Sequence, residues 1–416
     1  MKKAVLAVLS LCAAAFAQSL IGLNLPLGMP ANSVAGPASS MAGSGTAIID
    51  EYHGTALNPA NVAIGGRAAF SGLVSFDHLE IRDNSGDASV SGYSPKLLSL
   101  ILPLGGSGNI GFSMQRQYDA NLNFFTTRIL EDDLNYKSAT IQLQNVGGLT
   151  AWQAGWGYRF KNNMSFGLMY QRLFFNSESR NVYGSTFRYG NGLSFQSSME
   201  ETIITSFASN GMRFGLQMPV HEKVTAGVAA EYVFYSDKSG LSKREYLHVE
   251  GRQIDTLAPL SGEGKFSVHL PPSINAGLSY KPNNQWLLAI DGHCTMWERY
   301  YNSLDRANKF RTTYGVSLGS SFIPSTNRMS AKYWEIVHYR AGLRYSQLAL
   351  DGAQEYMMSF GTGLPIPNDG GLIDIIFGYG RRTADRYKGY SENVTKFELG
   401  INGGRNWFQK TTARNH

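Results

Sequence analysis

The sequence predicts an all-β fold: a transmembrane antiparallel β-barrel of about 14 strands with an N-terminal hatch inside its lumen. Three observations predict it. Charged residues are 16% of the 416 residues, below the roughly 25% usual for soluble domains. Glycine (46 residues) and aromatic residues (12%) are abundant. Apolar side chains recur at alternate positions, while no apolar run after residue 20 reaches the roughly 20 residues of a membrane helix.

The stretch 151–172 shows the repeating unit most clearly. Its alternate positions are apolar on both sides of a short turn, which is the pattern of a β-hairpin with one apolar and one polar face. A helix would scatter the same residues around its circumference. The alternating apolar residues are Trp152, Ala154, Trp156, Tyr158 and Phe160 before the turn, and Met164, Phe166, Leu168 and Tyr170 after it.

Residues 1–17 carry the features of a secretory signal peptide. Two lysines precede an apolar run that ends in an A-x-A cleavage pattern, and a short buried helix is the alternative. Cleavage before Gln18 would lower the formal net charge from +6 to +4, too slight an excess to indicate a nucleic-acid partner. The features are Lys2 and Lys3, the run Ala4–Phe16, and Ala15-Phe16-Ala17.

Residues 18–64 are predicted to form a compact hatch. They show little period-two pattern and many small residues, which let backbone pack closely in a confined space. Asp50 and the run Asn58-Pro59-Ala60 lie near the end of this segment, just before the first expected strand. A flexible linker is the alternative interpretation of the same composition.

Hairpin units recur over residues 65–408 and predict the barrel wall, and residues 409–416 are expected to form a periplasmic tail. Short connections such as Lys161–Asn163 alternate with long ones, as at the two rims of transmembrane barrels. Ile323–Val337 breaks this alternation. Long connections are expected at Thr127–Lys137, Asn181–Ser198 and Ser236–Gly264. The expected strands are centred near residues 72, 97, 115, 153, 168, 212, 229, 275, 290, 316, 342, 359, 376 and 398.

The two faces of these strands differ consistently along the chain. Apolar side chains occupy one face and polar or charged side chains the other. Aromatic residues gather near the strand ends, where amphipathic rings sit at the two membrane–water boundaries. A soluble β-sandwich is the alternative, but it needs no such girdles and leaves sheet edges to protect.

Both ends of the chain carry motifs that resemble one known family. Near the N-terminus these are the Gly/Ala/Ser run of residues 36–60, with Asp50, and Asn58-Pro59-Ala60. Near the C-terminus they are Phe360–Pro365, Phe377–Gly380 and Trp407-Phe408. These stretches resemble the long-chain fatty-acid transporter family of outer-membrane β-barrels (FadL/TodX-like).

The resemblance implies a fourteen-stranded barrel closed by a hatch. Hydrophobic substrates would be captured on the outer side and passed toward the periplasm or sideways into the membrane. A related branch of carrier barrels in type IX secretion (PorV-like) has a similar N-terminal segment, and the sequence does not separate the two branches.

Asp291 and His293 lie two residues apart on one expected strand, so both side chains point into the lumen. Such a pair could activate a water molecule, as in a barrel hydrolase. A pair held in a polar lumenal network is the more frequent arrangement, and the sequence offers no nucleophile or second acid beside it. The chain is therefore not predicted to be an enzyme, and no metal or cofactor is predicted.

Four arginines share the lumenal face. They could bind a ligand carboxylate or phosphate, or they could pair with the lumenal acids Glu231, Asp291 and Glu398. Two further basic clusters lie toward the long-connection rim, where they could meet lipopolysaccharide phosphates or simply be solvated. The lumenal arginines are Arg159, Arg213, Arg340 and Arg344. The rim clusters are Arg299, Arg306, Lys309 and Arg311, and Arg381, Arg382, Arg386 and Lys388.

The expected function is that of a passive channel for hydrophobic small molecules, such as long-chain fatty acids, in the outer membrane of a Gram-negative cell. The alternative is a docking or carrier barrel in protein secretion or surface attachment. Expected partners are outer-membrane lipids and lipopolysaccharide, a hydrophobic ligand, the barrel-assembly machinery and, for the alternative, a secreted protein.

Overall fold

The computed structural model describes residues 19–34, 36–49, 57–83, 86–105, 108–132, 135–188, 194–250, 253–256, 262–304, 310–327, 330–367, 370–385 and 390–405. Within them, fourteen antiparallel strands form a closed wall, because the last strand pairs with the first from Ala68↔Arg405 to Arg82↔Ser391. The wall strands are β2 (Ala68–Asp83), β3 (Gly86–Pro103), β4 (Asn109–Asp119), β6 (Asn135–Arg159), β7 (Ser165–Arg188), β8 (Ser194–His221), β9 (Val224–Val233), β13 (Ser273–Tyr280), β14 (Trp286–Thr295), β16 (Thr313–Phe322), β17 (His338–Gln347), β18 (Ala353–Ile366), β19 (Gly371–Ala384) and β20 (Ser391–Arg405).

The predicted fold class is confirmed. Each expected strand centre falls within one of these fourteen strands, and consecutive wall strands are neighbours in space. Because the ring is closed, each wall strand has a hydrogen-bonded neighbour on both sides, as a hydrocarbon environment requires. The predicted signal peptide (1–17), Asp50, Trp407-Phe408 and the tail (409–416) lie outside the described residues.

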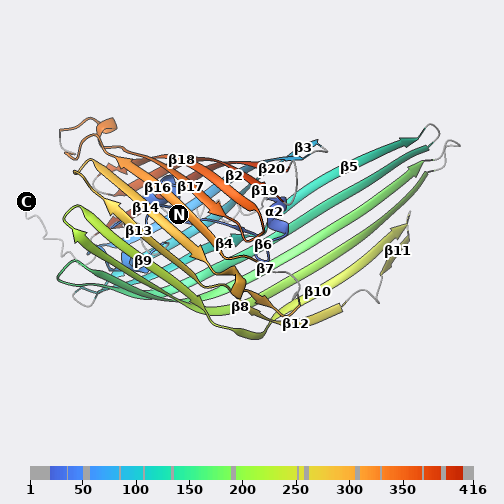
Figure 1. Ribbon diagram of the computed structural model, residues 1–416, viewed down its shortest axis with the longest axis horizontal. Helices are drawn as coiled ribbons and strands as arrows, with labels where there is room; N and C mark the ends of the chain where they lie inside the picture. Colours follow the sequence, from blue (N-terminus) through green and yellow to red (C-terminus); the bar gives the residue numbers. More distant parts are fainter. Residues whose placement is uncertain are drawn as a thin grey trace, which may run out of the picture.

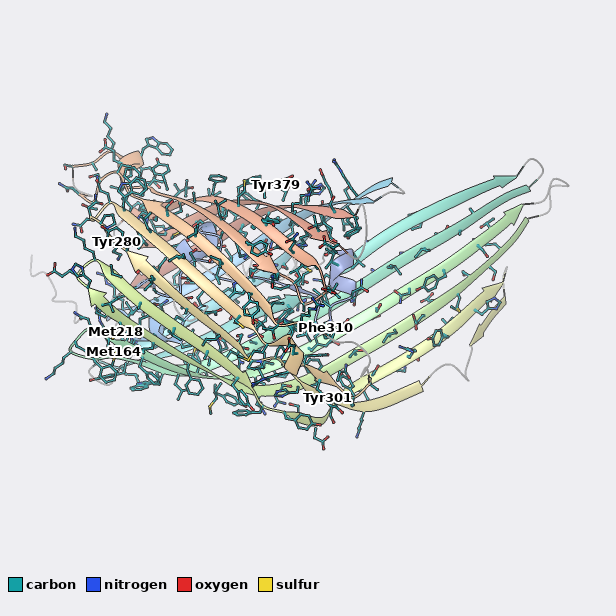
Figure 2. The ribbon with its side chains drawn as sticks, in the orientation of Figure 1. Met164, Met218, Tyr280, Tyr301, Phe310 and Tyr379 are labelled. Carbon is teal, nitrogen blue, oxygen red and sulfur yellow. The ribbon has the colours of Figure 1, made fainter. Side chains whose placement is uncertain are left out.

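The outer surface of the wall is an apolar belt. On β16, Val316 and Leu318 are 48% and 49% exposed, whereas Ser317 between them is buried. The same alternation repeats around the ring, so the exposed apolar faces do not meet each other in a dry core. Figure 2 shows Met164, Met218 and Tyr280 at the short-turn end of the barrel. In the described part of the chain, no helix is long and apolar enough to span a membrane.

A sheet extends beyond one side of the barrel, on the rim opposite the short turns (Figure 1). Strands β6, β7 and β8 have 25, 24 and 28 residues, about twice the 9–11 that a membrane-spanning strand needs. The expected long loops at Thr127–Lys137, Asn181–Ser198 and Ser236–Gly264 are therefore largely strand, which corrects that prediction. The additional elements are β5 (Leu122–Asp132), β10 (Ser236–Glu250), β11 (Gln253–Thr256), β12 (Gly262–His269), β15 (Tyr301–Asn302) and the 3-10 turn η4 (Trp297–Arg299).

Cross-strand polar pairs explain why these segments form strands. Arg180 Nε lies 2.5 Å from Glu200 Oε1, and the Tyr246 hydroxyl donates to Glu201 Oε1 at 2.7 Å. Such cross-strand pairs stabilise a sheet. On the opposite rim, the connection Ile323–Val337 contains a second 3-10 turn, η5 (Tyr333–Glu335).

The N-terminal segment lies within the ring of strands. It begins with α2 (Leu20–Leu23), whose first turn is capped because Ser19 Oγ accepts from Gly22 N. The two-residue strand β1 (Met29–Pro30) pairs with the end of β4, at Asp119 and Tyr118. The remaining elements are α3 (Pro37–Ser40) and the 3-10 turn η1 (Pro59–Ala63).

Glycines on the inner face of the wall give this segment its room. A Cβ on Gly167 would lie 2.1 Å from Pro59 O, and a Cβ on Gly215 would lie 2.1 Å from Asn58 Oδ1. Backbone and wall are thus closer than any other residue allows. Other inward glycines that contact the N-terminal segment in the same way are Gly157, Gly227, Gly319, Gly342 and Gly361.

Candidate functional site

Asp291 on β14 holds the middle of the N-terminal segment. Its Oδ2 accepts hydrogen bonds from Gly45 N and Thr46 N, each at 2.7 Å, and the residue is 5% exposed. Side chains of β8 and β13 hold the next residues. Gln217 Nε2 donates to Thr46 O and Ile48 O at 3.0 and 3.1 Å, and Ser279 Oγ donates to Ala47 O at 2.9 Å.

Asn58 and Pro59 hold the end of this segment. Asn58 Oδ1 accepts from Ala60 N at 2.9 Å, which caps η1, and Asn58 Nδ2 donates to Thr46 O at 2.8 Å. Pro59 takes the first position of the turn, where its missing N–H is not needed. The run Asn58-Pro59-Ala60 therefore links two parts of the segment and seats both against the inner wall.

The buried arginines form ion pairs, and two of the expected acids have other partners. Arg213 Nε lies 3.6 Å from Glu231 Oε2, and its Nη2 donates to Leu57 O at 3.2 Å. Asp291, however, binds the hatch amides described above. Glu398 accepts from Ser39 Oγ of α3.

The other arginine partners were not anticipated from the sequence. Arg340 Nη1 lies 2.5 Å from Asp374 Oδ1, and their side chains are 1% and 0% exposed. Gly363 on the strand between them leaves space for this pair. Arg344 Nη2 contacts Glu355 Oε1 at 2.6 Å. The alternation of the strands places all these groups inward, but alternation alone cannot say which of them meet.

The sequence also did not anticipate an ionic chain that reaches the start of the hatch. Glu355 pairs with Arg382 at 2.7 Å, and Arg382 pairs with Glu392 at 3.4 Å. Glu392 in turn accepts from Ser19 Oγ at 2.7 Å and Ile21 N at 3.3 Å. This chain joins β18, β19 and β20 to the N-terminal segment.

A cavity of about 240 Å³ lies between the hatch and the long-connection rim. One side of its lining is charged or polar, and the other is apolar, formed by hatch and loop residues. Arg159 is exposed near the short turn, away from this cavity. The polar side includes Arg213, Glu231, Asp291, His293, Arg344 and Glu355. The apolar side includes Leu25, Leu27, Leu149, Leu270, Trp297 and Leu348.

The apolar side continues into a larger cluster that caps the cavity. It joins α2 and the following residues to the loops of the long-connection rim, with Trp297 4% exposed and edge-on to Tyr118 at 5.6 Å between ring centroids. Phe310 packs on Trp297 at 6.0 Å between ring centroids, and Figure 2 shows it where the shorter strands end.

The geometry assigns Asp291 and His293 different surroundings. Asp291 is occupied by the hatch amides, and His293 packs over Gly315 of the next strand. Among the described residues, no group of three or more His, Cys, Asp or Glu side chains could hold a metal ion.

A family model described as BamG matches residues 1–413. The chain belongs to the BamG family. No curated protein matches it. Solved structures share its fold at low identity, so the likeness of the BamG-family chain to them concerns the fold alone.

Three of these structures match almost along their full length. A Pseudomonas aeruginosa FadL homologue has 14% identity and a TM-score of 0.60, covering 90% of this chain and 99% of that one. The CymD monoaromatic hydrocarbon channel has 16% identity and a TM-score of 0.57, covering 91% and 99%. The P. putida toluene transporter TodX has 14% identity and a TM-score of 0.56, covering 91% and 100%.

These matches confirm the predicted resemblance of the BamG-family chain to the FadL/TodX-like barrel fold. The descriptions of the second and third name a channel and a transporter, not enzymes. The resemblance to the type IX carrier branch stays a prediction.

Proposed function

We propose that this BamG-family chain is a passive outer-membrane transporter for small hydrophobic molecules, gated by residues 18–64. One observation carries the proposal. The cavity is enclosed by the hatch and by loops of the long-connection rim, and both contribute apolar side chains to its lining. An apolar solute arriving from the long-connection rim would gain about 25 cal/mol per Å² of apolar surface that it buries there. No chemical step is required for it to pass.

The cavity volume limits the substrate class. A cavity of about 150 Å³ is enough to hold benzene, so about 240 Å³ accommodates one aromatic ring with a short substituent. A long-chain fatty acid would require the hatch to move before it could enter. The toluene and monoaromatic hydrocarbon descriptions of structures with this fold support the same class.

Cells that produce the chain are expected to accumulate radiolabelled toluene faster than cells lacking it. Leu348→Glu should lower this uptake by about tenfold, because a carboxylate then replaces a buried apolar group at the cavity. Leu104→Glu is the matched control, since Leu104 is 48% exposed at the short-turn rim. Equal uptake with and without the chain would refute the transport role.

A second role, docking to the machinery that assembles outer-membrane barrels, is favoured by the sheet beyond the barrel and by the name of the family. Among the described residues, β5 pairs only with β6, and β11 only with β10. Each therefore leaves one backbone edge free to receive an extended strand of a partner.

This docking role predicts that the central barrel of the assembly machinery co-purifies with the tagged chain in fixed ratio from mild detergent. Replacing residues 126–141 by a two-residue turn removes most of β5 and its edge. It shortens β6 at its outer end but keeps the part of β6 that lies in the barrel wall. That variant should lose the partner yet retain toluene uptake. If the chain purifies without the assembly barrel, docking is excluded and transport is unaffected.

A further inference from the structure

The outer wall has one groove that neither proposed role uses. It crosses β16, β17, β18 and β19, has a volume of about 380 Å³, and its lining is almost wholly apolar apart from arginine side chains. Cross-strand pairing arranges its residues in two rows around the barrel. The row nearer the short turns is Leu318, Leu343, Met358 and Tyr379, and the row nearer the long connections is Val316, Tyr345, Tyr356 and Arg381.

The groove faces hydrocarbon over the first row. Leu343 is 59% exposed and Leu318 49% exposed, and both lie in the apolar belt. Figure 2 marks Tyr379 on the outer wall at β19. An acyl chain lying along these side chains would fill a depression that a flat annular contact leaves open.

The second row ends in a cation at the edge of the belt. Arg381 is exposed and follows Tyr345 and Tyr356, whose rings lie 5.1 Å apart. Immediately beyond it the surface becomes polar, and the Tyr345 hydroxyl donates to Gln354 Oε1 at 3.3 Å. Arg381 thus stands at the level where lipid headgroups begin.

Arg311 and Arg382, one from each predicted rim cluster, are already engaged, whereas Arg306, Lys309, Arg386 and Lys388 lie outside the described residues. Arg311 Nη1 lies 2.7 Å from Asp351, and Arg382 points inward to Glu355. Arg381 makes no ion pair with any residue that the structure describes. Its guanidinium therefore remains available for an anionic headgroup, which it can bind through paired hydrogen bonds.

We propose that this groove is a binding site for lipopolysaccharide of the outer leaflet. Arg381 binds a phosphate of the lipid, one acyl chain lies along Leu318, Leu343 and Met358, and Gln354 faces the sugar. The long connections mark the outer rim of such barrels, which places Arg381 in the leaflet that contains this lipid.

The test measures binding of purified lipopolysaccharide to the delipidated full chain in nanodiscs. Arg381→Ala should weaken binding by about tenfold, the change expected from losing a charge-assisted hydrogen bond. Met358→Trp should weaken it similarly, because the indole fills the groove without altering charge. Heat-dependent migration on a denaturing gel verifies that each variant is folded.

Arg172→Ala is the matched control. Arg172 lies on the outer face of β7, where its Nη1 donates to Asn210 Oδ1 at 2.7 Å, and it is not one of the residues that line the proposed groove. The control should bind lipopolysaccharide like the unaltered chain. Equal losses for Arg172→Ala and Arg381→Ala, or no loss for Arg381→Ala, would overturn the proposal. Displacement by inorganic phosphate, with Met358→Trp unaffected, would also overturn it by showing a bare anion site.

Discussion

Gly215→Val is expected to drive the hatch from its seat and turn a plugged barrel into a conducting one. A Cβ here would lie 2.1 Å from Asn58 Oδ1 and 2.6 Å from Ala60 N. A side chain at position 215 therefore cannot coexist with Asn58 and Ala60 in their observed positions. Overpacking costs about 1–3 kcal/mol, which raises the population with a displaced hatch by about fivefold to 150-fold. Steady ion current across a planar bilayer measures that population.

Gly292→Val is the control for this change. Gly292 lies in the same part of the wall but faces outward, and a Cβ there would be 4.0 Å from its nearest neighbour, Gly315 O. This variant should conduct no more than the unaltered chain. A Gly215→Val barrel that stays closed would show that the hatch can shift without opening a path.

Asp374→Ala is expected to lower the free energy of unfolding by about 3–5 kcal/mol, the cost of leaving one member of a buried ion pair without its partner. Arg340 is 1% exposed at its side chain and cannot reach water. Asn402 Nδ2, which donates to Asp374 Oδ2 at 2.5 Å, loses its acceptor as well. Urea unfolding in detergent, followed by tryptophan fluorescence, measures the difference.

The double variant Arg340→Met, Asp374→Leu separates charge from packing. Apolar replacements for both members of a buried pair are often neutral, so this variant should recover much of the lost stability. Should Asp374→Ala unfold at the urea concentration of the unaltered chain, the Arg340–Asp374 contact would contribute nothing to the fold.

The wall could be predicted from the sequence because its cause is local. A side-chain period of two is visible in each strand by itself, and fourteen repeats of it predict a closed ring in lipid. The sequence predicts a loop over Asn181–Ser198 because that segment has no regular alternation of apolar and polar residues. Only cross-strand partners such as Arg180 and Glu200 reveal it as sheet, and they are 20 residues apart.

For the interior of the barrel, the sequence predicts which kinds of side chain face inward but not which of them form pairs. Alternation placed Arg213, Arg340 and Arg344 inward, but the choice of Asp374 and Glu355 as partners depends on strand stagger, which no single strand encodes. The seat of the hatch was likewise hidden. Glycines such as Gly167 and Gly215 are common in any barrel. Only the structure shows that they make room for Pro59 and Asn58.

Ser19 and Glu392 are 373 residues apart and yet hydrogen-bonded, and Glu392 lies on the strand that seals the ring against β2. During biogenesis, Ser19 can therefore form this hydrogen bond only after β20 has been synthesised. A chain interrupted before β20 would lack the strand that closes the barrel against β2. It would also lack Glu392, the acceptor for Ser19. The N-terminal end of the hatch thus reaches its bound position only when translation and strand assembly have been completed.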